Sequence, residues 1–188
     1  MKILIQSLLF IIVVALFAVT SDRLTQIEQK ESMNAPTTSE PKLSDQDFLT
    51  QMIEHHEGAI AMAKEAEQKS KRSEIKDFAS DIISAQSGEI SFMYTWRQDW
   101  FKDEGHVNMR MGADMPSMAI SLGESDAEFD QRFLEAMITH HEGAIKMANQ
   151  VLLPTGRGEI HDLAKNIIAT QSKEIITMQS WLKEWYGK

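Results

Sequence analysis

Apolar side chains recur at steps of three and four residues along four stretches of the chain, the pattern of amphipathic helices. The second and fourth stretches run from about residues 75–101 and 160–186. The pattern breaks near residues 69–73 and at the sequence PTGRG, residues 154–158, where glycine and proline disfavour a helix. The chain from about Ser44 onward is therefore predicted to be all-α.

The four stretches are two copies of one sequence. FLTQMIEHHEGAIAMA at residues 48–63 returns as FLEAMITHHEGAIKMA at residues 133–148. The offset of 85 residues continues without a gap as far as Trp100 and Trp185, and about half of the paired positions are identical. Such self-similarity indicates a duplication. Each copy is expected to fold as one helical hairpin.

Two hairpins with one apolar face each bury those faces best against one another, which predicts a four-helix bundle. Repeat 1 is assigned to residues 44–102, a connector to residues 103–124 and repeat 2 to residues 125–187. Ser44 with Asp47, and Ser125 with Glu128, have the spacing of capping boxes. They are predicted to open the first helix of each repeat.

The start of the chain is predicted to direct export. Lys2 precedes an apolar run at residues 3–19, interrupted by two polar residues, which predicts a hydrophobic helix. This run is long for a signal-peptide core and at the short limit for a membrane span. A signal peptide at residues 1–21 and an uncleaved signal anchor therefore both remain open. Either would place the rest outside the cytoplasm, in the periplasm or cell envelope, after a polar, flexible linker at residues 22–43.

Polar residues also occur on the apolar faces of the predicted helices. A helical projection places His55 and His56 on the apolar arc of the first helix, and Gln86 with Glu89 at or beside that of the second. The second copy repeats the set as His140, His141, Gln171 and Glu174. A buried polar group without a partner costs about 1–3 kcal/mol, so the whole set needs a compensating interaction.

Two explanations fit these polar residues. In the first, His56 forms a hydrogen bond with Gln86 or Glu89 and only fixes the packing. In the second, the imidazoles bind a metal ion, with Gln86 and Glu89 orienting them and nearby methionines as thioether ligands. The thioethers that qualify in the first copy are those of Met52, Met62 and Met93. We favour the metal because the His-His pair is duplicated and flanked by methionine at helical spacing, although a methionine stripe alone is usually core filler.

The connector has a different composition from the helices. Between residues 106 and 118 it contains His106, Met109, Met111, Met115 and Met118. Thioether and imidazole form a soft ligand set that favours Cu(I) over zinc, calcium or magnesium. We therefore interpret this segment as a second copper-binding element. A hydrophobic strap over one end of the bundle is the alternative.

Composition narrows the class of protein further. The 188 residues include 12 methionines and no cysteine, which excludes a disulfide framework, a thiolate nucleophile and a zinc finger. The net charge of −9 argues against a nucleic-acid partner, which needs a basic surface. No nucleophile–base pair or phosphate-binding glycine loop is evident, so no enzyme is predicted.

The two repeats resemble domain-of-unknown-function family 305. The resemblance covers residues 44–187 and rests on the His-His block at residues 48–63 and 133–148, and on AxxIIxxQxxEIxxMxxW at residues 79–96 and 164–181. It implies a ferritin-like four-helix bundle, and its best understood members, CopM-like exported proteins, bind copper and contribute to copper resistance. The metal ligands that it implies here are Met52, His55, His56, Met62, Met93, Met137, His140, His141, Met147 and Met178. The methionine-rich connector is also a feature in which this chain resembles the family.

Three functions follow as hypotheses. The first is an extracytoplasmic protein that binds Cu(I), and Cu(II) as well, for buffering, transport or resistance, with other envelope copper-handling proteins as partners. The second is a ferritin-like di-metal oxidoreductase, which needs Glu-x-x-His motifs that neither His-His block contains. The third is an envelope protein without metal, whose tryptophan pairs (Trp96 with Trp100 and Trp181 with Trp185) form a docking surface. Membrane contact is expected only through the N-terminal segment.

Overall fold

The computed structural model describes residues 42–102, 121–152 and 156–188. These residues form four α-helices and no strand, so the predicted all-α fold is confirmed. The helices are α2 (Asp45–Lys69), α3 (Ser73–Trp100), α4 (Phe129–Val151) and α5 (Gly158–Tyr186).

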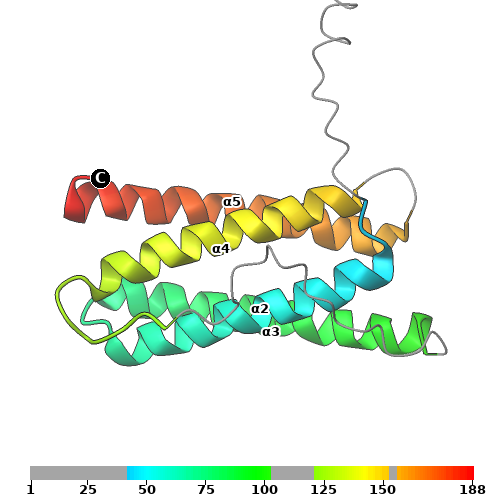
Figure 1. The fold of residues 1–188 in the computed structure, drawn as a ribbon, viewed down its shortest axis with the longest axis horizontal. Coiled ribbons are helices and arrows are strands. Elements are labelled where there is room, and N and C mark those ends of the chain that lie inside the picture. Colours follow the sequence, from blue (N-terminus) through cyan, green and yellow to red (C-terminus); the bar gives the residue numbers. More distant parts are fainter. Residues whose placement is uncertain (1–41, 103–120, 153–155) are drawn as a thin grey trace, which may run out of the picture. The chain divides into compact units, whose positions relative to one another are not determined.

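The helices form two hairpins, one for each repeat. Helix α2 packs along α3 and α4 packs along α5, and the hairpins meet mainly through α2 and α4 (Figure 1). The first hairpin turns tightly because Ser70 leaves the helical conformation while its N–H closes the last turn of α2 on the carbonyl of Ala66, at 2.9 Å. The predicted four-helix bundle of two tandem hairpins is therefore present.

The bundle contains two separate apolar clusters. Cluster 1 takes its buried residues from the C-terminal half of α2, the N-terminal halves of α3 and α4, and the end of α5. Cluster 2 takes them from the complementary halves. The buried members of cluster 1 are Ala59, Met62, Ala63, Ala66, Ile75, Ala79, Ile82, Leu122, Phe129, Phe133, Leu134, Met137, Met178 and Leu182. Those of cluster 2 are Phe48, Leu49, Met52, Ile53, Met93, Ala144, Met147, Ala148, Val151, Ile160, Leu163, Ala164 and Ile167.

A polar layer separates the two clusters along every helix. On α2, cluster 2 ends at Ile53 and cluster 1 begins at Ala59, with His55 and His56 between them. The same interruption occurs near the middle of α3, α4 and α5. We call these eight residues the polar layer: His55, His56, Gln86, Glu89, His140, His141, Gln171 and Glu174. Because each cluster draws on both repeats, neither hairpin has a complete core of its own.

Arginines at the start of α3 and α5 link the two repeats. The guanidinium carbon of Arg72 lies 4.2 Å from the centroid of a ring of Trp185, and its Nε lies 3.6 Å from an oxygen of Asp130. Arg157, its equivalent 85 residues later, lies 4.5 Å from the centroid of a ring of Trp100. The tryptophans are partly buried against the clusters, so these contacts close the ends of the bundle.

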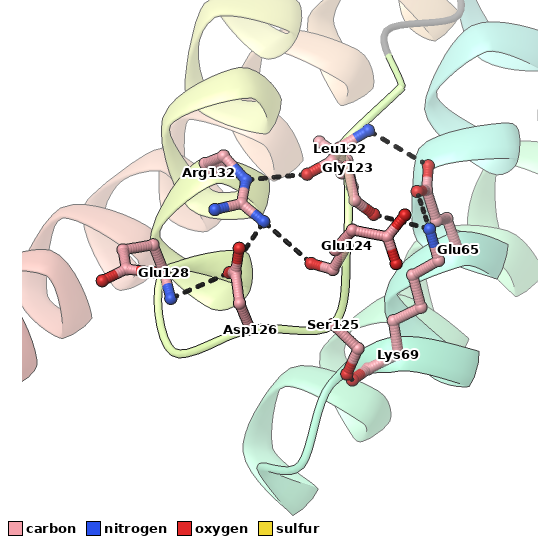
Figure 2. A network of polar contacts seen from close by, with 9 residues as sticks. All are labelled: Glu65, Lys69, Leu122, Gly123, Glu124, Ser125, Asp126, Glu128 and Arg132. Atoms are coloured by element: carbon pink, nitrogen blue, oxygen red, sulfur yellow. Dashed lines mark hydrogen bonds and ion pairs between the residues drawn. The ribbon is translucent and has the colours of Figure 1, made fainter.

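The segment that leads into α4 is fixed to the end of α2 (Figure 2). The N–H of Leu122 donates to Glu65 at 3.3 Å, and the ammonium of Lys69 donates to the carbonyl of Gly123 at 2.6 Å. The hydroxyl of Ser125 donates to the carbonyl of Lys69 at 2.7 Å. These bonds satisfy polar groups at the exposed end of α2 and position the start of the second repeat.

The predicted cap is correct for α2, where Ser44 is the N-cap, and wrong for α4. Ser44 accepts a hydrogen bond from the N–H of Asp47 at 3.1 Å, as expected of an N-cap. Helix α4 begins at Phe129, and its N-cap residue Glu128 makes no capping bond through its side chain. Ser125 does not cap this helix because its hydroxyl is bonded to the end of α2.

Several predicted segments lie outside the described residues. They are the N-terminal segment 1–21, nearly all of the linker 22–43, and connector residues 103–120, with His106 and its four methionines. Among the described helices, none has the length and apolar character needed to cross a membrane.

Candidate metal centre

The four histidines of the polar layer are packed into the middle of the bundle. His56 and His141 are fully buried, at 0% exposure, and His55 is 6% exposed. Each pair stands on adjacent positions of a helix, so one imidazole turns toward the helix partner in its hairpin and the other toward the opposite hairpin. The helical projection therefore placed all four correctly near the core.

Within each hairpin, a histidine is bonded to a glutamate of the next helix. Nε2 of His56 lies 2.6 Å from Oε2 of Glu89, and Nε2 of His141 lies 2.7 Å from Oε2 of Glu174. With the imidazole donating its Nε2–H to the carboxylate, the lone pair of the neutral ring remains on Nδ1. Both Nδ1 atoms are buried and have no hydrogen-bond partner.

Between the hairpins, the other two histidines contact one another. The ring centroids of His55 and His140 are 3.7 Å apart, with planes inclined at 48°. Gly143 lies beside this contact, where a Cβ atom would be 3.0 Å from Nε2 of His55. Nδ1 of His55 and both ring nitrogens of His140 are buried without a hydrogen-bond partner.

Burial keeps these two rings neutral. Desolvation, with smaller contributions from His56 and His141, lowers the pKa of His55 to about 3. Desolvation, with contributions from His55, His141 and His56, lowers the pKa of His140 to about 2. At neutral pH both rings therefore have lone pairs available to a metal ion.

The repeated methionines lie on both sides of the polar layer. All six are buried, with exposures of 0–4%. Cluster 2 contains Met52, Met93 and Met147, and cluster 1 contains Met62, Met137 and Met178. Thus Met52 and Met62, which flank the same His-His pair in sequence, belong to different clusters.

Two buried glutamine oxygens complete the layer. Oε1 of Gln86 and Oε1 of Gln171 are buried without a hydrogen-bond partner. Within residues 42–102, 121–152 and 156–188, no three His, Asp or Glu side chains gather as ligands of one ion. The soft donors beside the imidazoles are the thioethers of the two clusters.

Two features of the structure were not predicted from the sequence. Arg72 and Arg157 could have been identified, because they share the 85-residue offset of the tryptophans that they contact. His161 has no repeat equivalent, since Lys76 stands at the matching position. A Cβ atom on Gly156 would lie 2.8 Å from Oδ1 of Asp45 and 3.0 Å from Nε2 of His161, so these two side chains are close to one another.

A duplicated hairpin with a layer of imidazole–carboxylate pairs in its core defines a class of two-repeat four-helix bundles. The sequence profile described as Domain of unknown function (DUF305) matches residues 20–97 and 45–182. The chain belongs to this family.

Solved structures agree with the family assignment. "CopM in the Cu(II)-bound form" is 38% identical over 77% of this chain and 99% of that one, with a TM-score of 0.67. "CopM in the Cu(I)-bound form" is 36% identical with the same coverage and a TM-score of 0.64. A DUF305 fragment from Deinococcus radiodurans is 28% identical, again over 77% and 99% of the two chains, with a TM-score of 0.65. Comparison with curated protein sequences finds no match.

Proposed function

We propose that this chain is an exported copper-binding protein that buffers, transports or detoxifies copper outside the cytoplasm. The main support for this proposal is the pair of imidazole–carboxylate hydrogen bonds, His56 with Glu89 and His141 with Glu174. Each leaves a buried Nδ1 without a partner. A metal-binding histidine characteristically donates its other ring N–H to a carboxylate, which fixes the ring and makes it a stronger ligand.

The side chains that could act as ligands, imidazoles and thioethers, support copper as the metal. Imidazole binds both Cu(I) and Cu(II), whereas thioether prefers the softer Cu(I). Six buried thioethers adjoin the polar layer from its two sides. The similar protein CopM has been solved with Cu(I), Cu(II) and silver, which supports the same choice.

The remaining elements of the proposal come from the sequence. The apolar run at residues 3–19 favours export, with or without retention as a membrane anchor. The methionine-rich connector adds His106 and four thioethers as further copper donors. The protein acts by holding the ion and catalyses no reaction.

The proposal is tested by competition for Cu(I). The purified protein is titrated anaerobically against a chelator of known affinity, beside the double variant His56→Gln/His141→Gln. We expect the variant to lose affinity by more than about tenfold, because the oriented imidazoles are gone. His161→Gln is the matched control and should bind as the parent does. Copper binding equal in the parent and the double variant would contradict the proposal.

A further inference from the structure

Three aromatic side chains form a continuous stack along one edge of α3. The ring centroids of Phe92 and Trp96 are 6.2 Å apart, and those of Trp96 and Trp100 are 5.2 Å apart. Trp96 and Trp100 pack partly against cluster 2, whereas Phe92 is 60% exposed. A single exposed apolar side chain is common on a protein surface. This one differs because it prolongs a packed stack, and the stack thus has an apolar end that the described residues leave in contact with water.

The second repeat lacks this extension of the stack. Trp181 and Trp185, which match the two tryptophans of α3, stack in the same way, with 5.1 Å between their ring centroids. The position that matches Phe92 is Thr177, a polar residue. The additional exposed ring therefore belongs to the repeat from which the connector departs.

The connector has to run back along the bundle. It starts at the end of α3, which lies at the same end of the bundle as the start of α2 at Asp45 (Figure 1). Leu122, near the end of the connector, is held by Glu65, which lies 20 residues, or about 30 Å, further along α2. Residues 103–120 can reach about 60 Å when extended. The chain must therefore reverse its direction after α3, and it is long enough to follow the surface of that helix.

The side chains of the connector suit an aromatic surface. Methionine is flexible, fits irregular apolar surfaces, and makes favourable contacts between its sulfur and an aromatic ring. The connector has four methionines, of which Met109 and Met111 come first. From Trp100 back to Phe92 is two helical turns, or about 12 Å, a distance that four extended residues span. Met109 and Met111 are thus within reach of the whole stack.

We propose that the connector docks on the aromatic stack of its own repeat, with Met109 and Met111 against the rings of Phe92 and Trp96. The surface is on the outside of α3, separate from the polar layer inside the bundle. The interaction belongs to the metal-free chain and does not depend on the proposed copper function. It gives the exposed ring of Phe92 an apolar partner from the same molecule.

Limited proteolysis of the metal-free full-length protein tests the docking. Arg110 stands between the two methionines, so a trypsin cut after it reports on the connector, with the site identified by mass spectrometry. Phe92→Thr gives the first repeat the residue that the second has at this position. We expect this variant to be cut after Arg110 at least about fivefold faster than the parent, because the protease acts on the undocked population.

The second repeat provides the matched control. Ile176 on α5 is 65% exposed, and the residue that matches it in the first repeat is Ser91. Ile176→Ser therefore also removes an exposed apolar side chain by a swap between repeats, and it should be cut at the parental rate. Circular dichroism establishes that both variants keep the helical content of the parent.

A reciprocal change approaches the contact from the connector. Met109→Ser/Met111→Ser leaves the aromatic stack intact and removes the thioethers that would contact it. We expect the same faster cleavage after Arg110, and no further acceleration when Phe92→Thr is added, since both changes remove one interaction. Fully additive effects of the two changes would contradict a contact between them.

Two other results would overturn the inference. Equal cleavage after Arg110 in the parent and in Phe92→Thr would show that the connector does not dock on the stack. Protection that is lost on dilution, together with a dimer that sediments as a monomer after Phe92→Thr, would assign the stack to a second copy of the chain. Neither result bears on copper binding, which the competition with the chelator tests separately.

Discussion

The imidazole of His55 lies against that of its repeat equivalent, His140, with 3.7 Å between the ring centroids. Since these residues occupy matching positions of the two copies, their contact marks the approximate two-fold axis that relates the hairpins. The histidine–glutamate bonds and the methionine clusters are arranged around it in pairs. Two uncharged imidazoles in contact also make the centre of the bundle sensitive to acid.

Acid is expected to destabilise the protein as the pH falls from about 7 toward 4. An unfolded histidine takes up a proton near pH 6.5, whereas the pKa values of buried His55 and His140 are about 3 and about 2. The unfolded chain therefore binds more protons in this range. The free energy of unfolding should fall by up to about 1.4 kcal/mol per pH unit for each ring.

Urea denaturation at a series of pH values measures this slope. The variant His55→Gln/His140→Gln lacks both protonation sites and should show a shallower dependence between pH 6.5 and pH 4.5. An identical slope in parent and variant would show that these rings are not kept neutral by the fold.

Removal of one layer carboxylate is expected to destabilise the bundle even without metal. Glu89→Ala leaves the Nε2–H of His56 buried without its acceptor, which costs about 1–3 kcal/mol. Glu174→Ala should cost a similar amount, because its bond to His141 is equivalent. Denaturation in the presence of a chelator measures both. Glu142→Ala, on the exposed side of α4, is the control and should change stability by less than about 0.5 kcal/mol.

Two helical glycines are expected to respond in opposite ways to alanine. Gly88→Ala meets nothing within 4 Å and should stabilise α3 by about 0.5–1 kcal/mol, since alanine loses less backbone freedom on folding. Gly143→Ala places a Cβ 3.0 Å from Nε2 of His55 and must displace that ring. We therefore expect a lower melting temperature for Gly143→Ala than for Gly88→Ala. Equal gains in both variants would mean that the contact of His55 with His140 is loosely packed.

The arginine contacts between repeats are expected to contribute separately at the two ends of the bundle. Arg72→Ala and Arg157→Ala each remove a guanidinium from a tryptophan ring, at a cost of about 0.5–1 kcal/mol. Because the two contacts share no residue, the double variant should lose the sum of the single losses. Chemical denaturation of the parent, the two single variants and the double variant gives a double-mutant cycle. Lys71→Ala, at an exposed position, is the control. A double variant no less stable than either single one would contradict independent contacts.

The fold could be predicted from the sequence because the duplication constrained it. One apolar face per helix, short breaks within each copy and a longer connection between copies leave few arrangements other than two packed hairpins. The burial of His55 and His56 could also be predicted from the sequence, because a helix rotates by a fixed angle per residue. Periodicity therefore established which side chains enter the core.

Periodicity does not determine which side chains meet there. Met52 and Met62 lie on the same helix and flank the same histidines, so the sequence groups them, whereas packing of the second hairpin separates them into different clusters. Ser125 has the spacing of a helix cap, but its hydroxyl instead donates a hydrogen bond to the carbonyl of Lys69. Both outcomes depend on contacts between segments far apart in the chain, which no local pattern encodes.

The division of the core between the hairpins also bears on how such a chain arose. A single hairpin of this sequence would expose half of each apolar cluster, and an identical hairpin turned about a two-fold axis would cover both halves at once. The hairpin of this sequence is therefore self-complementary, in the way that the subunits of a two-fold homodimer are. Duplication of one hairpin-encoding segment and fusion of the copies through a linker makes that association intramolecular.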